Sequence, residues 1–357
     1  MERRVDLGII EGFFGRPYSW AERTDLMRSL KPHGYDFYIY APKADQRLRR
    51  AWREPHSAQE TAAIGAFSAK CRAAGVAFGV GLSPFELHFD FTVEARAALS
   101  DKLAALGDAG CQWLAILFDD MRGALPDLAR RQAEIIGFIA QRTTARRILV
   151  CPSYYTDDPI LDRVFGERPA HYLSDLGAAI DPAIDIMWTG EEVCSREYSL
   201  AHLDRVASEI GRKPFVWDNY PVNDGLRMSR HLHLRAVTGR PGAMAGHISG
   251  HAVNPASQPT LSRIPMLSLA ASYAQGPAYA YGQAFREAAH AVCGEALARH
   301  LADDLPTFED AGLDSLSAER RARLAELYGL FDQPAAREIV AWLKGEYAIT
   351  GEALQTQ

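Results

Sequence analysis

Eight short apolar runs, each followed by a segment with helical spacing, constrain the fold of this chain more than any other feature of its sequence. Such alternation is typical of parallel strands connected by helices. Eight repeats are the number that closes a (β/α)8 TIM barrel, and a barrel of about 250 residues fits within this chain. The expected strands are Leu7–Glu11, Phe37–Ala41, Ala77–Leu82, Trp113–Phe118, Ile148–Pro152, Ile184–Trp188, Phe215–Trp217 and Ala243–Ile248.

Helix signals mark the segments between the strands and the last part of the chain. Ser57–Ala74 opens with a capping-box pattern, and Val93–Gly107 ends on a glycine. Beyond about residue 276 no strand pattern remains. The helices expected there are Gln283–His300, Ala318–Phe331 and Ala335–Tyr347. We therefore expect a catalytic barrel over residues 1–280 and a small C-terminal helical region over residues 281–357, through which an oligomer can form.

The charge balance argues against some classes of partner. The formal net charge is -6, whereas nucleic acid or an anionic membrane calls for a basic face. A neutral or mildly polar substrate suits this balance better. No apolar run approaches the roughly 18 residues of a membrane span, and the first residues lack the apolar region of a signal peptide. We expect a cytoplasmic protein with no nucleic-acid or membrane partner.

The cysteines predict neither a disulfide framework nor a zinc site. They are five in number, widely spread, and form no CxxC pair. Free thiols in apolar segments usually pack as small hydrophobic groups. The five are Cys71, Cys111, Cys151, Cys194 and Cys293.

Polar or aromatic residues follow nearly every expected strand. The active site of a barrel lies at the C-terminal ends of its strands, so these residues are candidates for function. A lysine or a tryptophan taken alone is usually solvated or part of the core, but a place at a strand end favours binding. A sugar ring needs several hydrogen bonds and an aromatic wall, which this set supplies. It includes Glu11, Gly12, Lys43, Asp119, Asp120, Tyr155, Trp188, Trp217, Asn219, Asp224, His247 and Asn254.

Two adjacent carboxylates, Asp119 and Asp120, directly follow the apolar run Trp113–Phe118. Repulsion between charges so close, together with partial burial, should raise one pKa and leave an acid beside a carboxylate. The alternative is an Asp-Asp turn that caps the following helix. Their place at the catalytic face of a barrel favours the chemical role.

Seven motifs, in order along roughly residues 5–275, resemble glycoside hydrolase family 84. That family contains the O-GlcNAcases and related bacterial β-N-acetylglucosaminidases and hyaluronidase-like enzymes. The resemblance implies a retaining β-N-acetylglucosaminidase that hydrolyses terminal β-linked N-acetylglucosamine without a metal or an organic cofactor. The motifs are Gly8–Pro17, Tyr40–Lys43, Leu117–Asp120, Cys151–Tyr155, Trp188–Gly190, Trp217–Asp224 and Asn254–Pro255.

The resemblance also implies a role for each matching residue. Asp119 would orient and polarise the acetamido group of the substrate, and Asp120 would act first as general acid and then as general base. Asn219 would also hold the acetamido group, in a pocket lined by Tyr155, Trp188 and Trp217. The sugar hydroxyls would be bound by Gly12, Lys43, Asp224 and Asn254, with Asp224 on the 4- and 6-hydroxyls.

Two residues depart from the family pattern. Tyr154 stands where an acidic residue is usual, and Phe13 stands where tyrosine is common. Neither belongs to the carboxylate pair. They concern the rim of the pocket and the leaving-group preference.

The expected geometry of the pair favours an unusual nucleophile. Neighbouring side chains on a strand point to opposite faces, so Asp119 and Asp120 are poorly placed to flank one anomeric carbon. Most retaining glycosidases need two carboxylates there, but substrate-assisted enzymes do not. The acetamido oxygen of the substrate can attack instead and form an oxazoline. Asp119 then stabilises the charge on its nitrogen, while Asp120 protonates the leaving oxygen and later activates water.

Two other functions fit parts of the sequence. One is a barrel that binds N-acetyl sugars without cleaving them, against which the intact carboxylate pair argues. The other is a metal-dependent barrel hydrolase with His247, His251 and Asp218 as ligands, which a chelator test would separate. The natural substrate stays open among a glycoprotein or glycopeptide, a glycan fragment and a cell-wall sugar.

Overall fold

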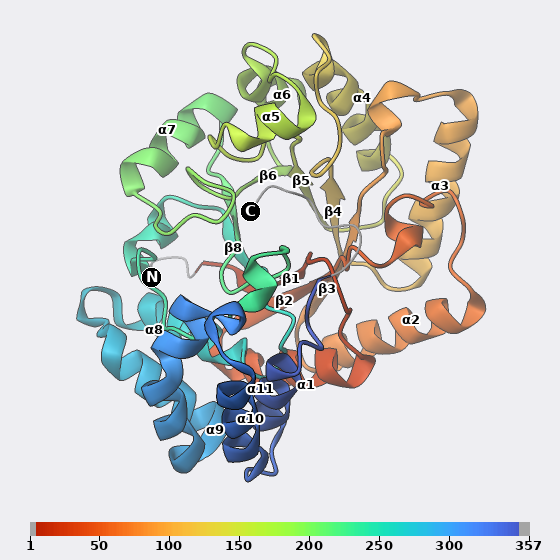
Figure 1. The fold of residues 1–357 in the computed structure, drawn as a ribbon. Helices are drawn as coiled ribbons and strands as arrows, with labels where there is room; N and C mark the ends of the chain where they lie inside the picture. The colour runs from red at the N-terminus through yellow and green to blue at the C-terminus, as the bar shows by residue number, and fades with distance from the viewer. Residues whose placement is uncertain (1–4, 350–357) are drawn as a thin grey trace.

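The eight strands pair in chain order and close into a parallel barrel in the computed structural model, which describes residues 5–349 (Figure 1). Strand β1 pairs with both β2 and β8, which closes the sheet. The strands are almost wholly buried, because a parallel barrel is covered on its outer face and filled inside. They are β1 (Leu7–Glu11), β2 (Tyr35–Tyr40), β3 (Ala77–Leu82), β4 (Trp113–Leu117), β5 (Arg147–Cys151), β6 (Asp185–Trp188), β7 (Phe215–Asp218) and β8 (Gly250–Val253).

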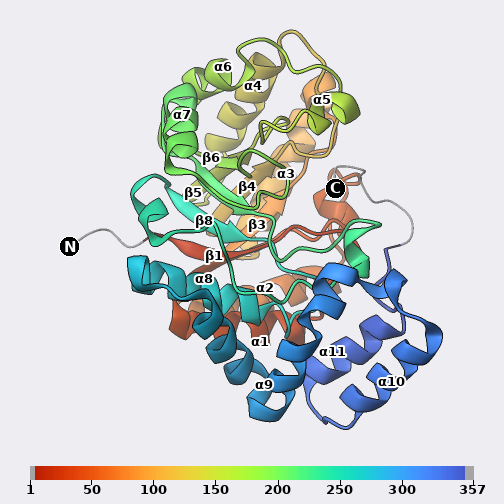
Figure 2. The same cartoon turned by 60° about the vertical axis from the view of Figure 1, so that its left-hand side comes forward.

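Helices α1 to α8 lie around the barrel (Figures 1 and 2). The capping box before α2 is confirmed, with Ser57 and Glu60 each bonding the backbone N–H of the other. Helix α3 runs one residue past the predicted glycine end. The bounds are α1 (Trp20–Leu30), α2 (Ala58–Ala73), α3 (Val93–Asp108), α4 (Leu128–Ala140), α5 (Ile160–Phe165), α6 (Tyr172–Ala179), α7 (Leu200–Ile210) and α8 (Arg263–Gln275).

The predicted position of the eighth strand is wrong. The predicted run, Ala243–Ile248, lies largely in a 3-10 helix, and β8 follows it at Gly250–Val253. Strand β8 contains a fully buried histidine, His251, which the residue pattern marks as polar. Its ring contacts Asp218 at 3.2 Å and the Tyr273 hydroxyl at 2.7 Å. These partners satisfy the ring inside the strand, and no local pattern reveals them.

Three further helices pack beside the barrel (Figure 2). They are α9 (Tyr281–Leu305), α10 (Ala318–Gly329) and α11 (Pro334–Leu343). Together they bury a second hydrophobic cluster that also includes Leu232 in the loop after β7, Leu261 in the loop after β8, and Ile264 in α8. The division of the chain at residue 280 remains a prediction.

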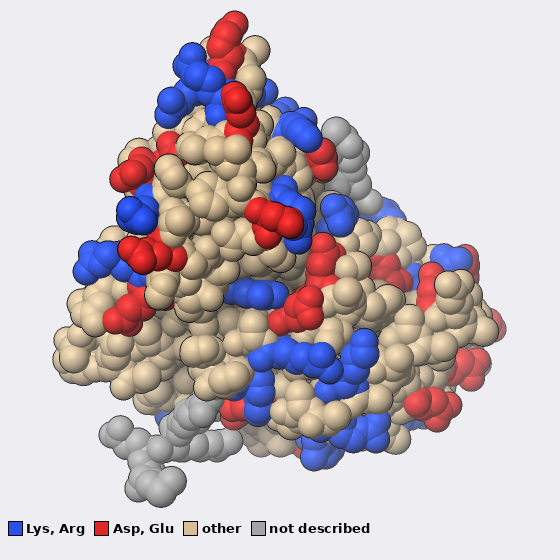
Figure 3. All heavy atoms as spheres, turned by 90° about the horizontal axis from the view of Figure 1, so that it is seen from below, with Lys and Arg blue, Asp and Glu red and all other residues tan. Residues whose placement is uncertain are grey.

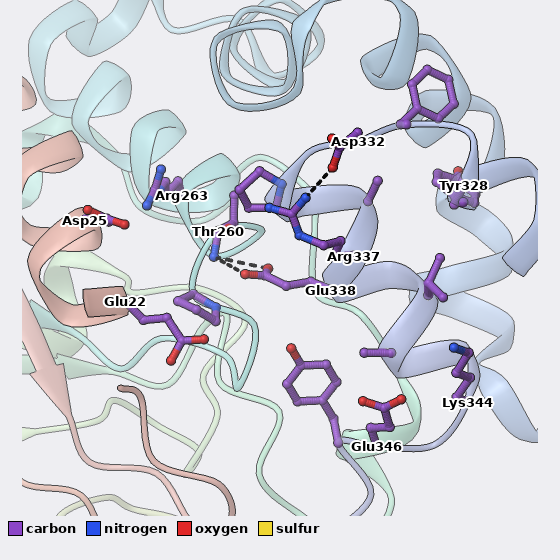
Figure 4. A pocket seen from close by; sticks show the side chains of 18 of the residues that line it. Glu22, Asp25, Thr260, Arg263, Tyr328, Asp332, Arg337, Glu338, Lys344 and Glu346 are labelled. Atoms are coloured by element: carbon purple, nitrogen blue, oxygen red, sulfur yellow. Dashed lines mark hydrogen bonds and ion pairs between the residues drawn. The ribbon is translucent and has the colours of Figure 1, made fainter. Parts of the chain in front are cut away.

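Polar contacts join α11 to the same two loops, and Figure 4 shows the contact with Thr260 in the loop after β8. The carboxylate of Glu338 accepts the backbone N–H of Thr260, at 2.8 and 3.1 Å, and that of Leu261, at 2.9 Å. The indole of Trp342 donates to the carbonyl of Ser229 at 3.2 Å. Burial raises the pKa of Glu338 to about 7. Helix α11 therefore supports two loops that begin at the C-terminal ends of barrel strands.

Charged side chains of both signs occur on the surface. On the face drawn in Figure 3, lysines and arginines are interspersed with aspartates and glutamates. Among residues 5–349, no helix combines the length and the apolar character that a membrane crossing requires. All five cysteines are free thiols, and four of them are buried.

Candidate active site

A cavity opens at the C-terminal ends of the strands, where the loops of the barrel converge. The empty space in it, part of which is open to solvent, is about 500 Å³. Nine of the ten residues predicted for the site line it: Gly12, Lys43, Asp119, Asp120, Tyr155, Trp217, Asn219, Asp224 and Asn254. The remaining lining residues are Phe14, Cys151, Thr189, Val193 and Gly225.

One buried ammonium holds both carboxylates of the adjacent pair. Lys43 Nζ lies 2.5 Å from Oδ2 of Asp119 and 2.9 Å from Oδ2 of Asp120. All three side chains are less than a tenth exposed. The other oxygen of Asp119, Oδ1, is buried and has no hydrogen-bond partner among residues 5–349. An unsatisfied buried acceptor is costly, so this atom is a natural site for a donor on a bound ligand.

The prediction that Asp119 and Asp120 point apart is wrong. Strand β4 ends at Leu117, so the alternation of side chains in a strand does not extend to the pair. Asp120 also has a φ of 59°, an uncommon conformation for a residue with a side chain. This turn of the backbone brings its carboxylate to the same ammonium as that of Asp119.

Burial and mutual electrostatic interactions shift the pKa values of Asp120 and Lys43. Burial raises the pKa of Asp120 to about 6, with repulsion from Asp119 adding to the effect and attraction to Lys43 opposing it. Burial lowers the pKa of Lys43, but the two carboxylates outweigh this, and the net pKa is raised. Near neutral pH the lysine therefore stays charged while Asp120 can gain or lose a proton, as a general acid and base must.

A chain of amides fixes the opposite wall of the cavity. Asn219 Oδ1 accepts from Trp217 Nε1 and from Asn254 Nδ2, both at 3.0 Å. Asn219 Nδ2 donates to the carbonyl of Val193 at 2.8 Å, and Asn254 Oδ1 accepts the Gly12 N–H at 3.1 Å. These bonds leave one orientation for each amide and join the ends of β1, β7 and β8.

Two close contacts bring the end of β1 against the β7 side of the cavity. A Cβ at Gly12 would lie 2.5 Å from Cζ2 of Trp217, so only glycine lets the indole lie there. Asp224, which is buried, accepts the backbone N–H of Phe14 at 2.7 Å. The loop after β7 is thereby attached to the loop after β1.

Trp188 does not line the cavity, contrary to the prediction. Its indole donates to Nε2 of His202 on α7 at 2.9 Å, so the ring lies between the barrel and its outer helices. Thr189, the residue directly after β6, lines the cavity instead. Phe14, Cys151 and Thr189 lie within motifs noted in the sequence, whereas Val193 and Gly225 lie outside them.

The three residues considered as metal ligands do not converge. His247 pairs with Asp204 at 2.6 Å, away from Asp218. Asp218 accepts two bonds from Arg240, at 2.9 and 2.8 Å. Burial raises the pKa of Asp218, but Arg240 and then His251 overcome this and hold it well below its usual range. Across residues 5–349, no group of three or more His, Cys, Asp or Glu is arranged to hold a metal ion.

Known proteins resemble this chain over most of its sequence. A family model described as beta-N-acetylglucosaminidase matches residues 7–309. The protein O-GlcNAcases of Mus musculus and Rattus norvegicus are each 29% identical to this chain over 281 residues. The match covers 76% of this chain and 30% of each relative, so the chain spans less than a third of their length.

Two solved structures share the fold over most of the chain. A mutant of the Thermobaculum terrenum O-GlcNAc hydrolase has a TM-score of 0.78 and 27% identity, covering 95% of this chain and 80% of that one. The structure titled CpGH84B has a TM-score of 0.77 and 24% identity, covering 94% and 66%. The second likeness concerns the fold alone.

Proposed function

The chain belongs to the β-N-acetylglucosaminidase family, glycoside hydrolase family 84, and from this we propose that it removes terminal β-linked N-acetylglucosamine with retention, using the acetamido group of the substrate as nucleophile. One observation carries the proposal. Asp119 lines the cavity, one of its oxygens accepts from Lys43, and the other, Oδ1, is buried and has no hydrogen-bond partner within residues 5–349.

Asp119 is the residue we propose to hold the acetamido group. The substrate N–H is a donor that satisfies Oδ1 and turns the acetamido oxygen toward the anomeric carbon. When that oxygen attacks, positive charge develops on the nitrogen beside the carboxylate. A preorganised charge in a dry pocket stabilises such a transition state by a few kcal/mol, about 3 for a single donor or acceptor.

Asp120 is the residue we propose to move the proton. With a pKa of about 6, it is protonated in part of the enzyme near neutral pH and can protonate the leaving oxygen. The resulting carboxylate then takes a proton from the water that opens the oxazoline. Lys43 stays charged throughout and keeps both carboxylates in place.

The other lining residues support binding of a single sugar ring. Trp217 and Tyr155 are large, mostly buried aromatic side chains that line the cavity. They provide the apolar surface that the methyl group of an acetamido substituent needs. The amide oxygen of Asn219 accepts two hydrogen bonds, and its nitrogen donates one N–H to Val193. The second N–H of this amide can donate to a ligand. We propose that Gly12, Lys43, Asp224 and Asn254 bind the sugar hydroxyls.

The proposed substrates are glycans, glycopeptides and glycoproteins that carry this sugar at an end. Rates on an aryl N-acetyl-β-glucosaminide, a glycosylated peptide and a short oligosaccharide distinguish these classes. We also propose that the protein is cytoplasmic and that it forms an oligomer through α9 to α11. Cell fractionation and the mass of the purified protein in solution test them.

The direct test is hydrolysis of an aryl N-acetyl-β-glucosaminide compared with the matching β-glucoside, which lacks the acetamido group. We expect turnover of the first only, with the β-anomer of the free sugar released first in an NMR time course. The double variant Asp119→Asn with Asp120→Asn is the inactive control. Binding without turnover would indicate a sugar-binding barrel, and inhibition by a chelator would indicate a metal-dependent hydrolase.

A further inference from the structure

A second buried cation, Arg49, lies close to the proposed catalytic cluster. It follows Lys43 on the loop between β2 and α2 and is only 3% exposed. Its guanidinium carbon lies 5.4 Å from the centre of the Phe14 ring and 5.5 Å from that of Phe85. Lys43 Nζ lies 5.7 Å from the same Phe14 ring. Phe14, which lines the cavity, is thus contacted by two buried cations.

The position of Phe14 matters for the site in two ways. Its ring forms part of the cavity wall, and its backbone N–H is the donor to Asp224 at 2.7 Å. The guanidinium of Arg49 lies near both the Phe14 ring and the Phe85 ring, and a desolvated cation is attracted to each aromatic face. Arg49 therefore joins the loop after β1 to the loop after β3.

We propose that Arg49 is a positioning residue, which holds Phe14 at the pocket wall and places a second positive charge beside the cluster of Lys43, Asp119 and Asp120. The inference rests on the proposed function of that cluster. The charge of Arg49 lowers the pKa of Asp120 and also that of Lys43, and in each case the effect is smaller than that of burial and of the nearest charges.

The charge of Arg49 has opposite effects on the two steps of the reaction. It favours the ionised form of Asp120, which the water step needs as a base. It disfavours the protonated form, which the first step needs as an acid. Without this charge, Asp120 keeps its proton to higher pH, so the first step should persist into more alkaline solution.

The neighbouring Arg50 offers a matched control. Its guanidinium lies over the same Phe85 ring at 4.3 Å, but its side chain is exposed, whereas that of Arg49 is buried. Arg50→Met removes an arginine-ring contact of the same kind without changing the buried charge. Arg49→Lys keeps the charge and loses the planar contact with the rings.

The experiment has a readout that does not depend on activity. The Asp120 carboxyl carbon is titrated by NMR in the ligand-free enzyme, with its signal assigned by its loss in Asp120→Asn. In Arg49→Met we expect the midpoint to move upward, whereas in Arg49→Lys and Arg50→Met it stays at the wild-type value. In kinetics on the aryl substrate, the alkaline limb of kcat/KM should move upward with it, and KM should rise about 3- to 10-fold.

The results for these variants either support or contradict the proposed role of Arg49. An unmoved Asp120 midpoint in folded Arg49→Met, or an equal shift in Arg50→Met, would overturn the inference. If Arg49→Met does not fold, Arg49→Lys still tests the positioning role, because an unchanged KM would contradict it. If the wild type does not hydrolyse the aryl substrate, the proposed function fails, while the NMR titration still tests Arg49 by itself.

Discussion

The carboxylates of Asp119 and Asp120, adjacent in the chain, contact the same atom, the Nζ of Lys43, at 2.5 and 2.9 Å. The two carboxylates nevertheless differ in their hydrogen bonding and in their pKa. Asp119 lines the cavity and has a buried oxygen with no hydrogen-bond partner in the described part of the chain, and the pKa of Asp120 is raised to about 6. One carboxylate is therefore suited to hold a donor and stabilise charge, and the other is suited to transfer a proton.

Replacing the proposed acid should affect substrates according to their leaving groups. Asp120→Asn should lower kcat/KM by about 100- to 10,000-fold on a glycopeptide, whose poor leaving group needs protonation. The loss should be much smaller on an aryl glycoside with an acidic phenol. Parallel measurements on both substrates check this, and equal losses would rule out the acid role of Asp120.

The pH dependence follows from the raised pKa of Asp120. The first step needs the protonated form, so kcat/KM should fall as pH rises above about 6, approaching tenfold per pH unit. The same limb should be absent in Asp120→Asn. A pH series on an aryl substrate measures both enzymes. A limb that persists in the variant would assign the titration to another group.

The alternation of apolar runs was enough to predict the barrel, because each strand is buried on both faces and each run is bounded by a helix signal. It failed at β8, where His251 interrupts the apolar run and only partners distant in the chain, Asp218 and Tyr273, make it suitable for burial. Long-range hydrogen bonds of this kind leave no local pattern.

The sequence was enough to predict most of the residues in the candidate site, but not the directions in which their side chains point. Positions after the strands identify Lys43 and Asn219, yet the side on which Trp188 lies depends on where β6 begins its alternation. The turn at Asp120, with its φ of 59°, is likewise set by the surrounding loops. The support that α11 gives to two barrel loops required the tertiary structure.

The contact between Gly12 and Trp217 predicts a specific glycine effect. Gly12→Ala would place a Cβ 2.5 Å from the indole, so the ring must move, at a cost of about 1–3 kcal/mol. We expect lower thermal stability and a kcat/KM reduced about 10- to 100-fold if the cost appears in substrate binding.

Gly137 in α4 provides the control, because a Cβ there meets nothing within 4 Å. Gly137→Ala should leave activity unchanged and stabilise the protein by about 0.4–1 kcal/mol, since alanine restricts the unfolded chain more than glycine does. Thermal unfolding and steady-state kinetics of the two variants test the pair. Equal behaviour of Gly12→Ala and Gly137→Ala would contradict the account of the Gly12 contact.

Glu338 predicts a pH dependence of stability. Burial raises its pKa to about 7, above the ordinary value near 4.5, so between these values the folded chain binds more protons than the unfolded chain. Its contribution is therefore fully present below about pH 4.5 and is lost as pH rises through about 7, a loss of about 3 kcal/mol at most. Urea unfolding of wild type and Glu338→Gln from pH 5 to 8 measures it. The variant should lose this dependence, and identical slopes would assign it elsewhere.

Fluorination of the acetyl group tests the central claim most directly, because that group is the proposed nucleophile. In a series of aryl N-acetyl-β-glucosaminides, successive replacement of the acetyl hydrogens by fluorine makes the carbonyl oxygen less nucleophilic. If this oxygen attacks while Asp119 stabilises the nitrogen, kcat/KM should fall steeply and progressively across the series. Equal rates for all members, or a covalent glycosyl-aspartate trapped on Asp119 or Asp120, would contradict the account.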